Sequence, residues 1–266
     1  MQYNNIKNTN INVSRVSFGT ASLHHLISSK KRRYLLEAIA SMGVTHFDTS
    51  PYYGYGLSEI DLGVLLRKYR ENITVSTKIG LYPPTGATQG VLNVLSRKLL
   101  GKFNPNYSKA EVDWSLKRAS KSIEVSLKRL NRDYVDFLFL HEPNILLIDK
   151  EELMYWAEEL KKQGKIRYVG LAGLPKILAP WVESKHPLIN ILQTRDGANE
   201  KSLVDTFQRN GFKPQFTYGY LSDVKKSDLL NGINSIMHDA YTRNSTGSII
   251  VSSKKIERFK ELIDEI

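Results

Sequence analysis

The chain alternates eight times between a short apolar run and a longer stretch with apolar residues at helical spacing. The short runs have the length of buried strands, and the longer stretches have the period of helices with one buried face. We predict strands at 15–18, 45–49, 73–77, 134–140, 166–171, 188–193, 215–218 and 248–251. The helices that we predict are 30–42, 57–69, 108–130, 149–162, 176–183, 201–209, 228–240 and 255–266.

Eight strand–helix units favour an α/β fold, the (β/α)8 or TIM barrel, as one domain over residues 1–266. The strands of such a barrel are apolar along their whole length because both of their faces are covered. A doubly wound open sheet is the alternative. Against it, no G-x-G-x-x-G fingerprint follows an early strand, so a nucleotide site would have to be built in another way.

The longest irregular stretch lies between the third strand and the third helix, at residues 80–107. A loop of this length in a compact domain is usually functional, and we expect it on the substrate side. Ser108 and Glu111 have the spacing of a capping box, which predicts that the third helix begins there.

Composition describes a globular chain without a membrane-spanning segment. Hydrophobic residues make up 41% of it, mean hydropathy is −0.34, and no apolar run approaches the roughly 18 residues that a membrane helix needs. There are no cysteines, which excludes disulfides and thiolate metal sites and suits a reducing compartment. No secretory signal is visible at the N-terminus, so we expect a cytoplasmic protein.

The net charge of +11 raises the question of a polyanionic partner. Lysines and arginines are spread over nearly every predicted helix instead of gathering with aromatic residues in one segment. We therefore interpret them as a solvated surface, and we expect neither nucleic acid nor a membrane as partner.

Polar side chains follow three predicted strands at their carboxyl ends. Asp48 ends the second strand with Tyr53 five residues later, Lys78 ends the third, and His141 ends the fourth. Catalytic groups of a parallel barrel collect at this end. Each residue alone has an ordinary structural explanation, but their joint occurrence at three successive strand ends predicts a shared cavity.

These four residues can protonate a carbonyl oxygen while a hydride reaches its carbon. A free phenol has a pKa of about 10, and a nearby ammonium is expected to lower it. Lys78 would supply that charge, Asp48 would hold Lys78 in place, and His141 would donate to the same substrate oxygen.

The sequence resembles the aldo-keto reductase family, most strongly before residue 175. The resemblance lies in Phe18-Gly19-Thr20, in 46–54 (HFDTSPYYG), in Ser76-Thr77-Lys78 and in 136–143 (DFLFLHEP). It implies a barrel that binds an extended nicotinamide cofactor and reduces a small aldehyde or ketone. Tyr53 would be the general acid, Asp48 and Lys78 would tune it, and His141 would orient the carbonyl. No metal is implied.

The resemblance also implies a set of cofactor-binding positions and NADPH rather than NADH. A serine hydroxyl and a guanidinium suit a 2′-phosphate. The implied cofactor-binding residues are Gly19, Thr20, Asp48, Gln193, Tyr218, Gly219, Leu221, Ser252, Ser253, Arg258 and Glu261.

Two positions depart from the family pattern. Ala172-Gly173 stands where the family has Ser-Asn, and Leu262 stands where it has a final asparagine. A cofactor-binding sensor or partner subunit with little turnover is therefore an alternative, and a barrel in which Lys78 forms a Schiff base is another. The substrate, the physiological direction and the oligomeric state stay open.

Overall fold

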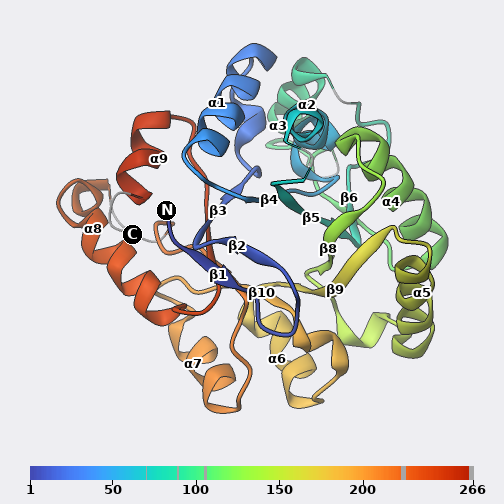
Figure 1. The fold of residues 1–266 in the computed structure, drawn as a ribbon. Coiled ribbons are helices and arrows are strands. Elements are labelled where there is room, and N and C mark those ends of the chain that lie inside the picture. Colours follow the sequence, from blue (N-terminus) through green and yellow to red (C-terminus); the bar gives the residue numbers. More distant parts are fainter. Residues whose placement is uncertain (70, 89, 105–106, 223–225, 264–266) are drawn as a thin grey trace.

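A closed barrel of eight parallel strands organises the molecule (Figure 1). The computed structural model describes residues 1–69, 71–88, 90–104, 107–222 and 226–263, and the statements below concern these residues. In spatial order the barrel strands are β10 (Leu192–Arg195), β11 (Phe216–Tyr218), β12 (Ser248–Val251), β3 (Val16–Gly19), β4 (His46–Asp48), β5 (Thr74–Ile79), β8 (Val135–His141) and β9 (Ile166–Gly173). The predicted (β/α)8 barrel is confirmed, and the open sheet is excluded.

Helices surround the barrel on its outside (Figure 1). They are α1 (Ser29–Ser41), α2 (Leu57–Lys68), α3 (Val91–Leu100), α4 (Leu116–Leu130), α5 (Lys150–Lys162), α6 (Pro175–Glu183), α7 (Lys201–Arg209), α8 (Lys226–Arg243) and α9 (Ile256–Ile263). In the described part of the chain, none of them is long and apolar enough to cross a membrane.

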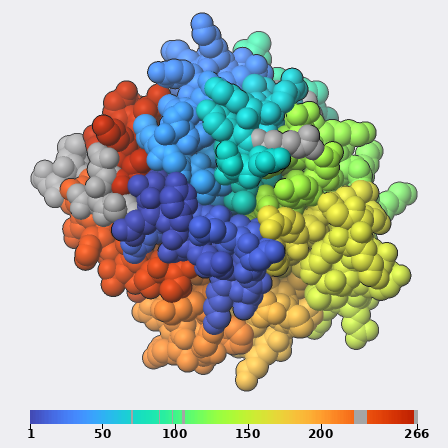
Figure 2. Space-filling model, in the orientation of Figure 1, coloured from blue at the N-terminus to red at the C-terminus, as the bar shows by residue number. Residues whose placement is uncertain are grey.

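The barrel closes where its first and last strands pair, with Ile250 opposite Ser17. A hairpin of β1 (Tyr3–Asn5) and β2 (Asn12–Ser14) precedes the first barrel strand and lies across the amino ends of the strands (Figures 1 and 2). The Asn4 amide donates to the Gly247 carbonyl oxygen at 2.8 Å, just before β12. This end of the barrel is thus covered, and a ligand site belongs at the other end.

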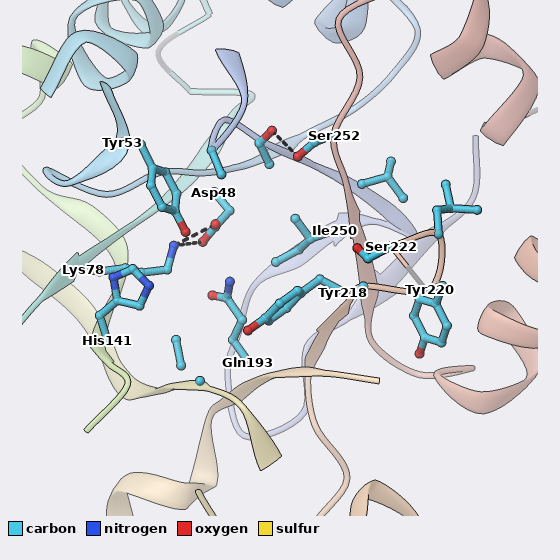
Figure 3. A pocket seen from close by; sticks show the side chains of 17 residues that line it. Asp48, Tyr53, Lys78, His141, Gln193, Tyr218, Tyr220, Ser222, Ile250 and Ser252 are labelled. Carbon is cyan, nitrogen blue, oxygen red and sulfur yellow. Dashed lines mark hydrogen bonds and ion pairs between the residues drawn. The ribbon is translucent and has the colours of Figure 1, made fainter. Parts of the chain in front are cut away.

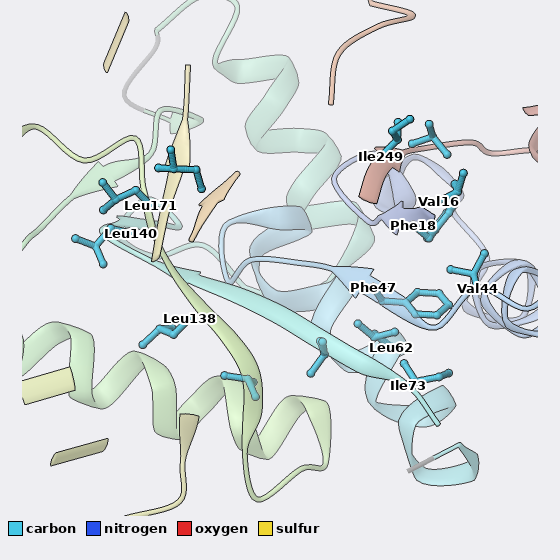
Figure 4. Packing of buried hydrophobic residues seen from close by; sticks show 14 of the residues in the cluster. Val16, Phe18, Val44, Phe47, Leu62, Ile73, Leu138, Leu140, Leu171 and Ile249 are labelled. Atoms are coloured by element: carbon cyan, nitrogen blue, oxygen red, sulfur yellow. The ribbon is translucent and has the colours of Figure 1, made fainter. Parts of the chain in front are cut away.

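Two apolar clusters hold the fold together. The larger one lies between the strands and the surrounding helices, and Figure 4 shows Phe18, Phe47 and Leu138 among its members. The smaller one fills the barrel interior, where Phe137 and Phe216 pack with side chains of the hairpin. Burial of both strand faces explains why a strand such as β8, with the sequence VDFLFLH, is apolar along most of its length.

The stretch at 80–107 is more regular than we predicted from the sequence. It contains the short strand β6 (Leu81–Tyr82) and the three-turn helix α3. The capping-box prediction was wrong, because Glu111 lies in strand β7 (Glu111–Val112), which pairs with β6. Helix α4 begins after Ser115, whose side chain accepts a hydrogen bond from the Arg118 amide.

The later units agree with the predictions except for small shifts. The strand predicted at 188–193 is a 3-10 turn at Pro187–Asn190 followed by β10. The last helix begins as predicted within one residue, and the final part of its predicted range, 264–266, lies outside the described residues.

Candidate active site

The carboxyl ends of three adjacent strands supply the core of the site. Strand β4 pairs with β5, and β5 pairs with β8, so Asp48, Lys78 and His141 lie on neighbouring strands. Asp48 is the last residue of β4 and His141 is the last residue of β8. The prediction that these side chains meet at one strand edge is confirmed.

Tyr53 reaches the same place from a tight turn after β4. Gly54 and Gly56 have φ angles of 58° and 92°, a left-handed conformation that glycine adopts without strain. Tyr55 between them has a φ angle of 56°. The turn brings Tyr53 back over the strand ends. The Lys78 Nζ atom lies 4.8 Å from the centre of the Tyr53 ring, and the Tyr53 and His141 rings are 6.0 Å apart.

Lys78 is fully buried, and its ammonium group is held by three oxygens. It donates to Asp48 Oδ1 at 2.8 Å, to Asp48 Oδ2 at 2.7 Å and to the Thr49 carbonyl oxygen at 2.8 Å. Ser76 donates to Asp48 Oδ1 at 2.7 Å. The ammonium is thereby fixed beside the phenol, and the carboxylate largely neutralises its charge.

Burial sets the protonation states of the site. It raises the pKa of Tyr53 well above the ordinary value, and the charges of Asp48 and Glu142 raise it further. Our expectation that Lys78 would lower this pKa was wrong, because desolvation dominates and Asp48 offsets the ammonium. Burial and then the Lys78 charge lower the pKa of His141 well below the ordinary value. At neutral pH the phenol is therefore protonated and the imidazole is neutral.

These four residues border a cavity of about 250 Å³ at the carboxyl end of the barrel (Figure 3). Figure 3 shows Tyr53, Lys78 and His141 on one side of it, with the Tyr218 ring and the Gln193 amide opposite. Seven of the residues implied for cofactor binding line the same cavity: Gly19, Asp48, Gln193, Tyr218, Gly219, Leu221 and Ser252. Tyr220, Ser222 and Ile250 also line it and were missed, although each lies at or just after a strand end.

The cavity suits a nicotinamide ring at several points. Gln193 is buried and its Oε1 has no hydrogen-bond partner in the described residues, so it is available to a ligand amide. A Cβ atom on Gly19 would come within 2.8 Å of Ser252 Oγ, so only glycine fits this wall. The Tyr218 ring supplies an aromatic face beside them.

The other implied cofactor residues lie outside the cavity. Thr20 is buried and its hydroxyl donates to the Asp48 carbonyl oxygen at 3.0 Å. Ser253 contacts the backbone of Lys255 before α9 through two hydrogen bonds. Arg258 and Glu261 lie on the exposed side of α9.

Both departures from the family pattern have a structural counterpart. Leu262 is buried in the outer core, and its carbonyl oxygen accepts a hydrogen bond from the Tyr241 hydroxyl. A Cβ on Gly173 would lie 2.9 Å from Glu142 Oε2, so Glu142 occupies the space beside this glycine. Its carboxylate accepts from the Leu174 amide at 3.1 Å. Sequence reasoning missed Glu142, since nothing in its local pattern distinguishes it from a surface acid.

No group of three or more histidines, aspartates or glutamates suited to hold a metal ion occurs among the residues that the structure describes. The acidic side chain of the site, Asp48, is instead paired with Lys78.

Comparison with known proteins agrees with this geometry. The model of the Aldo/keto reductase family matches residues 15–211, well over half of the chain. L-galactose dehydrogenase of Arabidopsis thaliana is 30% identical over 210 residues, which cover 74% of this chain and 58% of that protein. D-threo-aldose 1-dehydrogenase of a Pseudomonas species is 29% identical over 176 residues, which cover 61% of this chain and 50% of that protein. The matches thus span between half and three fifths of the length of these relatives.

The fold is also found in solved structures. An aldo-keto reductase from Bacillus halodurans, in its holo form, superimposes with a TM-score of 0.76 at 18% sequence identity. The match covers 100% of this chain and 90% of that one. At this identity the likeness concerns the fold alone.

Proposed function

This chain belongs to the aldo/keto reductase family, and on that premise we propose that it reduces an aldehyde or ketone with NADPH, using Tyr53 as general acid. The observation that carries the proposal is the buried cluster of Tyr53, Lys78, Asp48 and His141 at the wall of one cavity. A phenol, an ammonium, a carboxylate and a neutral imidazole are the groups that carbonyl protonation needs.

Tyr53 holds the proton that the carbonyl oxygen receives. A bound nicotinamide cofactor would supply the hydride to the carbonyl carbon. Because burial raises the pKa of Tyr53, the phenol keeps its proton until a substrate oxygen acquires negative charge. The products would be the alcohol, the oxidised cofactor and a Tyr53 phenolate, which takes up a proton from solvent before the next turnover.

Lys78 and His141 assist this transfer in different ways. The Lys78 ammonium lies against the Tyr53 ring and stabilises the phenolate that forms. The neutral His141 ring can donate one N–H to the same carbonyl oxygen and so fix its position. Asp48 keeps Lys78 charged and in place through its two contacts.

The proposed cofactor position runs from Gln193 and Tyr218 past Gly19 towards α9. Gln193 would bind the carboxamide and Tyr218 would stack on the ring. Arg258 is exposed at the start of α9, beyond Ser252 and Ser253, where a 2′-phosphate would lie. A guanidinium binds phosphate in a bidentate manner, which favours NADPH.

We expect Arg258→Ala to test this preference. The variant should bind NADPH about 10- to 150-fold more weakly, because one charge-assisted contact contributes about 1.5–3 kcal/mol, and it should bind NADH unchanged. Fluorescence titration of both cofactors measures this. Equal loss for the two cofactors would contradict the assignment of Arg258 to the phosphate.

A sugar or a related polyol is the proposed substrate class. The names of two relatives, L-galactose dehydrogenase and D-threo-aldose 1-dehydrogenase, support it. The cavity also carries the hydroxyl of Ser222, which the cofactor assignment does not use and which can bind a polyol.

The proposal is tested with the purified chain, both nicotinamide cofactors and a panel of aldoses, simple aldehydes and ketones. We expect NADPH to bind and to be consumed with at least one carbonyl, or NADP to be reduced with the matching alcohol. Tight binding without turnover across the panel would favour the sensor or partner subunit. Borohydride trapping of a substrate on Lys78 would favour the Schiff-base alternative instead.

A further inference from the structure

Helix α3 exposes a stripe of large apolar side chains. Leu92, Leu95 and Leu99 follow one another at helical spacing and are 80%, 37% and 59% exposed. Phe103, just after the helix, extends the stripe and is 86% exposed. Val94, on another side of the helix, is fully buried. A contiguous apolar patch of this kind on a surface marks a site of interaction.

The segment around α3 carries only positive charge. Residues 83–110 include Arg97, Lys98, Lys102 and Lys109 and no aspartate or glutamate. The Arg97 guanidinium donates to the carbonyl oxygens of Tyr107 and Thr85, which joins the helix to the rest of the segment. An apolar face with basic residues beside it suits a surface that is both apolar and anionic.

This surface lies at the carboxyl end of the barrel. Helix α3 packs against the 3-10 turn Tyr53–Gly56, which carries Tyr53. Two other loops at this end of the barrel also expose large apolar residues, Ile27 after β3 at 66% and Leu146 after β8 at 88%. Lys30 and Lys31 follow Ile27 and are exposed. The opposite end is covered by the hairpin (Figure 2).

We propose that α3 is an interfacial helix that binds the surface of an anionic lipid bilayer. The apolar stripe would enter the boundary between headgroups and acyl chains, and the exposed Lys102 and Lys109 would face the anionic headgroups. A second copy of the chain is a poorer partner, because stacking two α3 segments would bring two surfaces with a net positive charge together. The expectation of no membrane partner rested on the lack of a long apolar run and on the spread of the basic residues, and peripheral attachment through α3 goes beyond it.

The inference does not depend on the catalytic proposal. It concerns peripheral attachment and involves neither the cavity nor its four polar residues. Attachment through α3 would hold the carboxyl end of the barrel, where the cavity opens, close to the membrane.

Co-sedimentation with vesicles tests the inference. The full chain should bind vesicles of phosphatidylcholine with phosphatidylglycerol, should not bind phosphatidylcholine alone, and should be released by salt. Lys102→Ala should lower the partition coefficient about fivefold, because each basic residue near an anionic surface contributes about 1 kcal/mol. Leu99→Ser should lower it by at least as much. Both side chains are exposed, so the variants should keep the wild-type unfolding transition.

Two matched controls separate α3 from the basic surface in general. Lys213→Ala removes the same charge from the loop before β11, at the other end of the barrel, and Leu203→Ser removes an exposed leucine from α7. Both should bind vesicles like the wild type. Absence of binding to anionic vesicles at low salt would overturn the proposal. So would equal losses in the α3 variants and the controls, or a dimer that Leu99→Ser dissociates.

Discussion

The ion pair between Lys78 and Asp48 is the most buried charge interaction of the site. Their side chains are 1% and 4% exposed, and every proton of the ammonium has an oxygen within hydrogen-bond distance. Removal of one partner from such a pair leaves the other charge in a place that water does not reach. Loss of one partner is therefore expected to destabilise the fold.

We predict that Lys78→Met lowers the free energy of unfolding by about 3–5 kcal/mol, because Asp48 is left unpaired. The double variant Asp48→Asn, Lys78→Met should lose less than Lys78→Met alone. Urea unfolding at neutral pH of the wild type, both single variants and the double variant measures the coupling. Additive losses would mean that the two charges do not interact.

For single residues, the sequence predicted which side chains form the site better than it predicted their pKa values. Asp48, Lys78 and His141 could be found because each ends an apolar strand, and parallel strand ends meet. The direction in which the Tyr53 pKa shifts could not be predicted, because it depends on burial and on how far the Asp48 charge offsets the Lys78 charge. Glu142 was missed for a similar reason, since its importance comes from Gly173 on the neighbouring strand.

At the scale of elements, the start of α4 shows how a local pattern can mislead. The Glu111 carboxylate accepts from the Thr85 backbone amide at 2.6 Å, and its backbone is part of a strand pair. The Glu111 carboxylate, which would bind a helix amide in a capping box, thus binds Thr85 instead. Helix α3 was overlooked because prolines and glycines flank it, although its own residues have a helical period.

We predict that Ser115→Ala destabilises the protein by about 1 kcal/mol, since its side chain caps the first turn of α4. Ser108→Ala is the matched control and should cost less than about 0.5 kcal/mol, the usual range for a surface change. Urea unfolding of both variants shows whether the helix begins after Ser115 or at Ser108. A larger loss for Ser108→Ala would restore the original capping-box assignment.

At the scale of the whole molecule, the barrel was predictable because its period repeats eight times. A single misplaced boundary does not change the number of strands or their apolar character. The sequence could not reveal that a histidine lies in the barrel interior. His46 is fully buried, its Nδ1 lies 2.9 Å from Thr74 Oγ1, and its ring stacks on Phe216 at 4.8 Å.

His46 is expected to make the fold sensitive to acid. Burial, and then the Lys78 charge, lower the pKa of His46 to about 3, whereas an unfolded histidine has a pKa of about 6.5. Below pH 6.5 the His46 imidazole binds a proton in the unfolded chain but stays neutral in the folded chain. The stability is thus complete above about pH 6.5 and is lost progressively as the pH falls towards 3.

We predict that His46→Leu loses less stability on acidification than the wild type, by about 2–3 kcal/mol between pH 7 and pH 4.5. His238→Leu, an exposed position on α8, should keep the wild-type acid loss. Urea unfolding at the two pH values gives the comparison. Equal acid losses in all three proteins would contradict a neutral buried His46.

The proposed reaction depends on transfer of the Tyr53 proton to a carbonyl oxygen in this cavity. The direct measurement is the rate of carbonyl reduction by Tyr53→Phe with saturating NADPH, beside NADPH affinity and unfolding free energy of the same variant. We expect a rate about 10²–10⁴-fold lower, the usual contribution of a general acid, with NADPH affinity and unfolding free energy unchanged. A variant that turns over as fast as the wild type would contradict it.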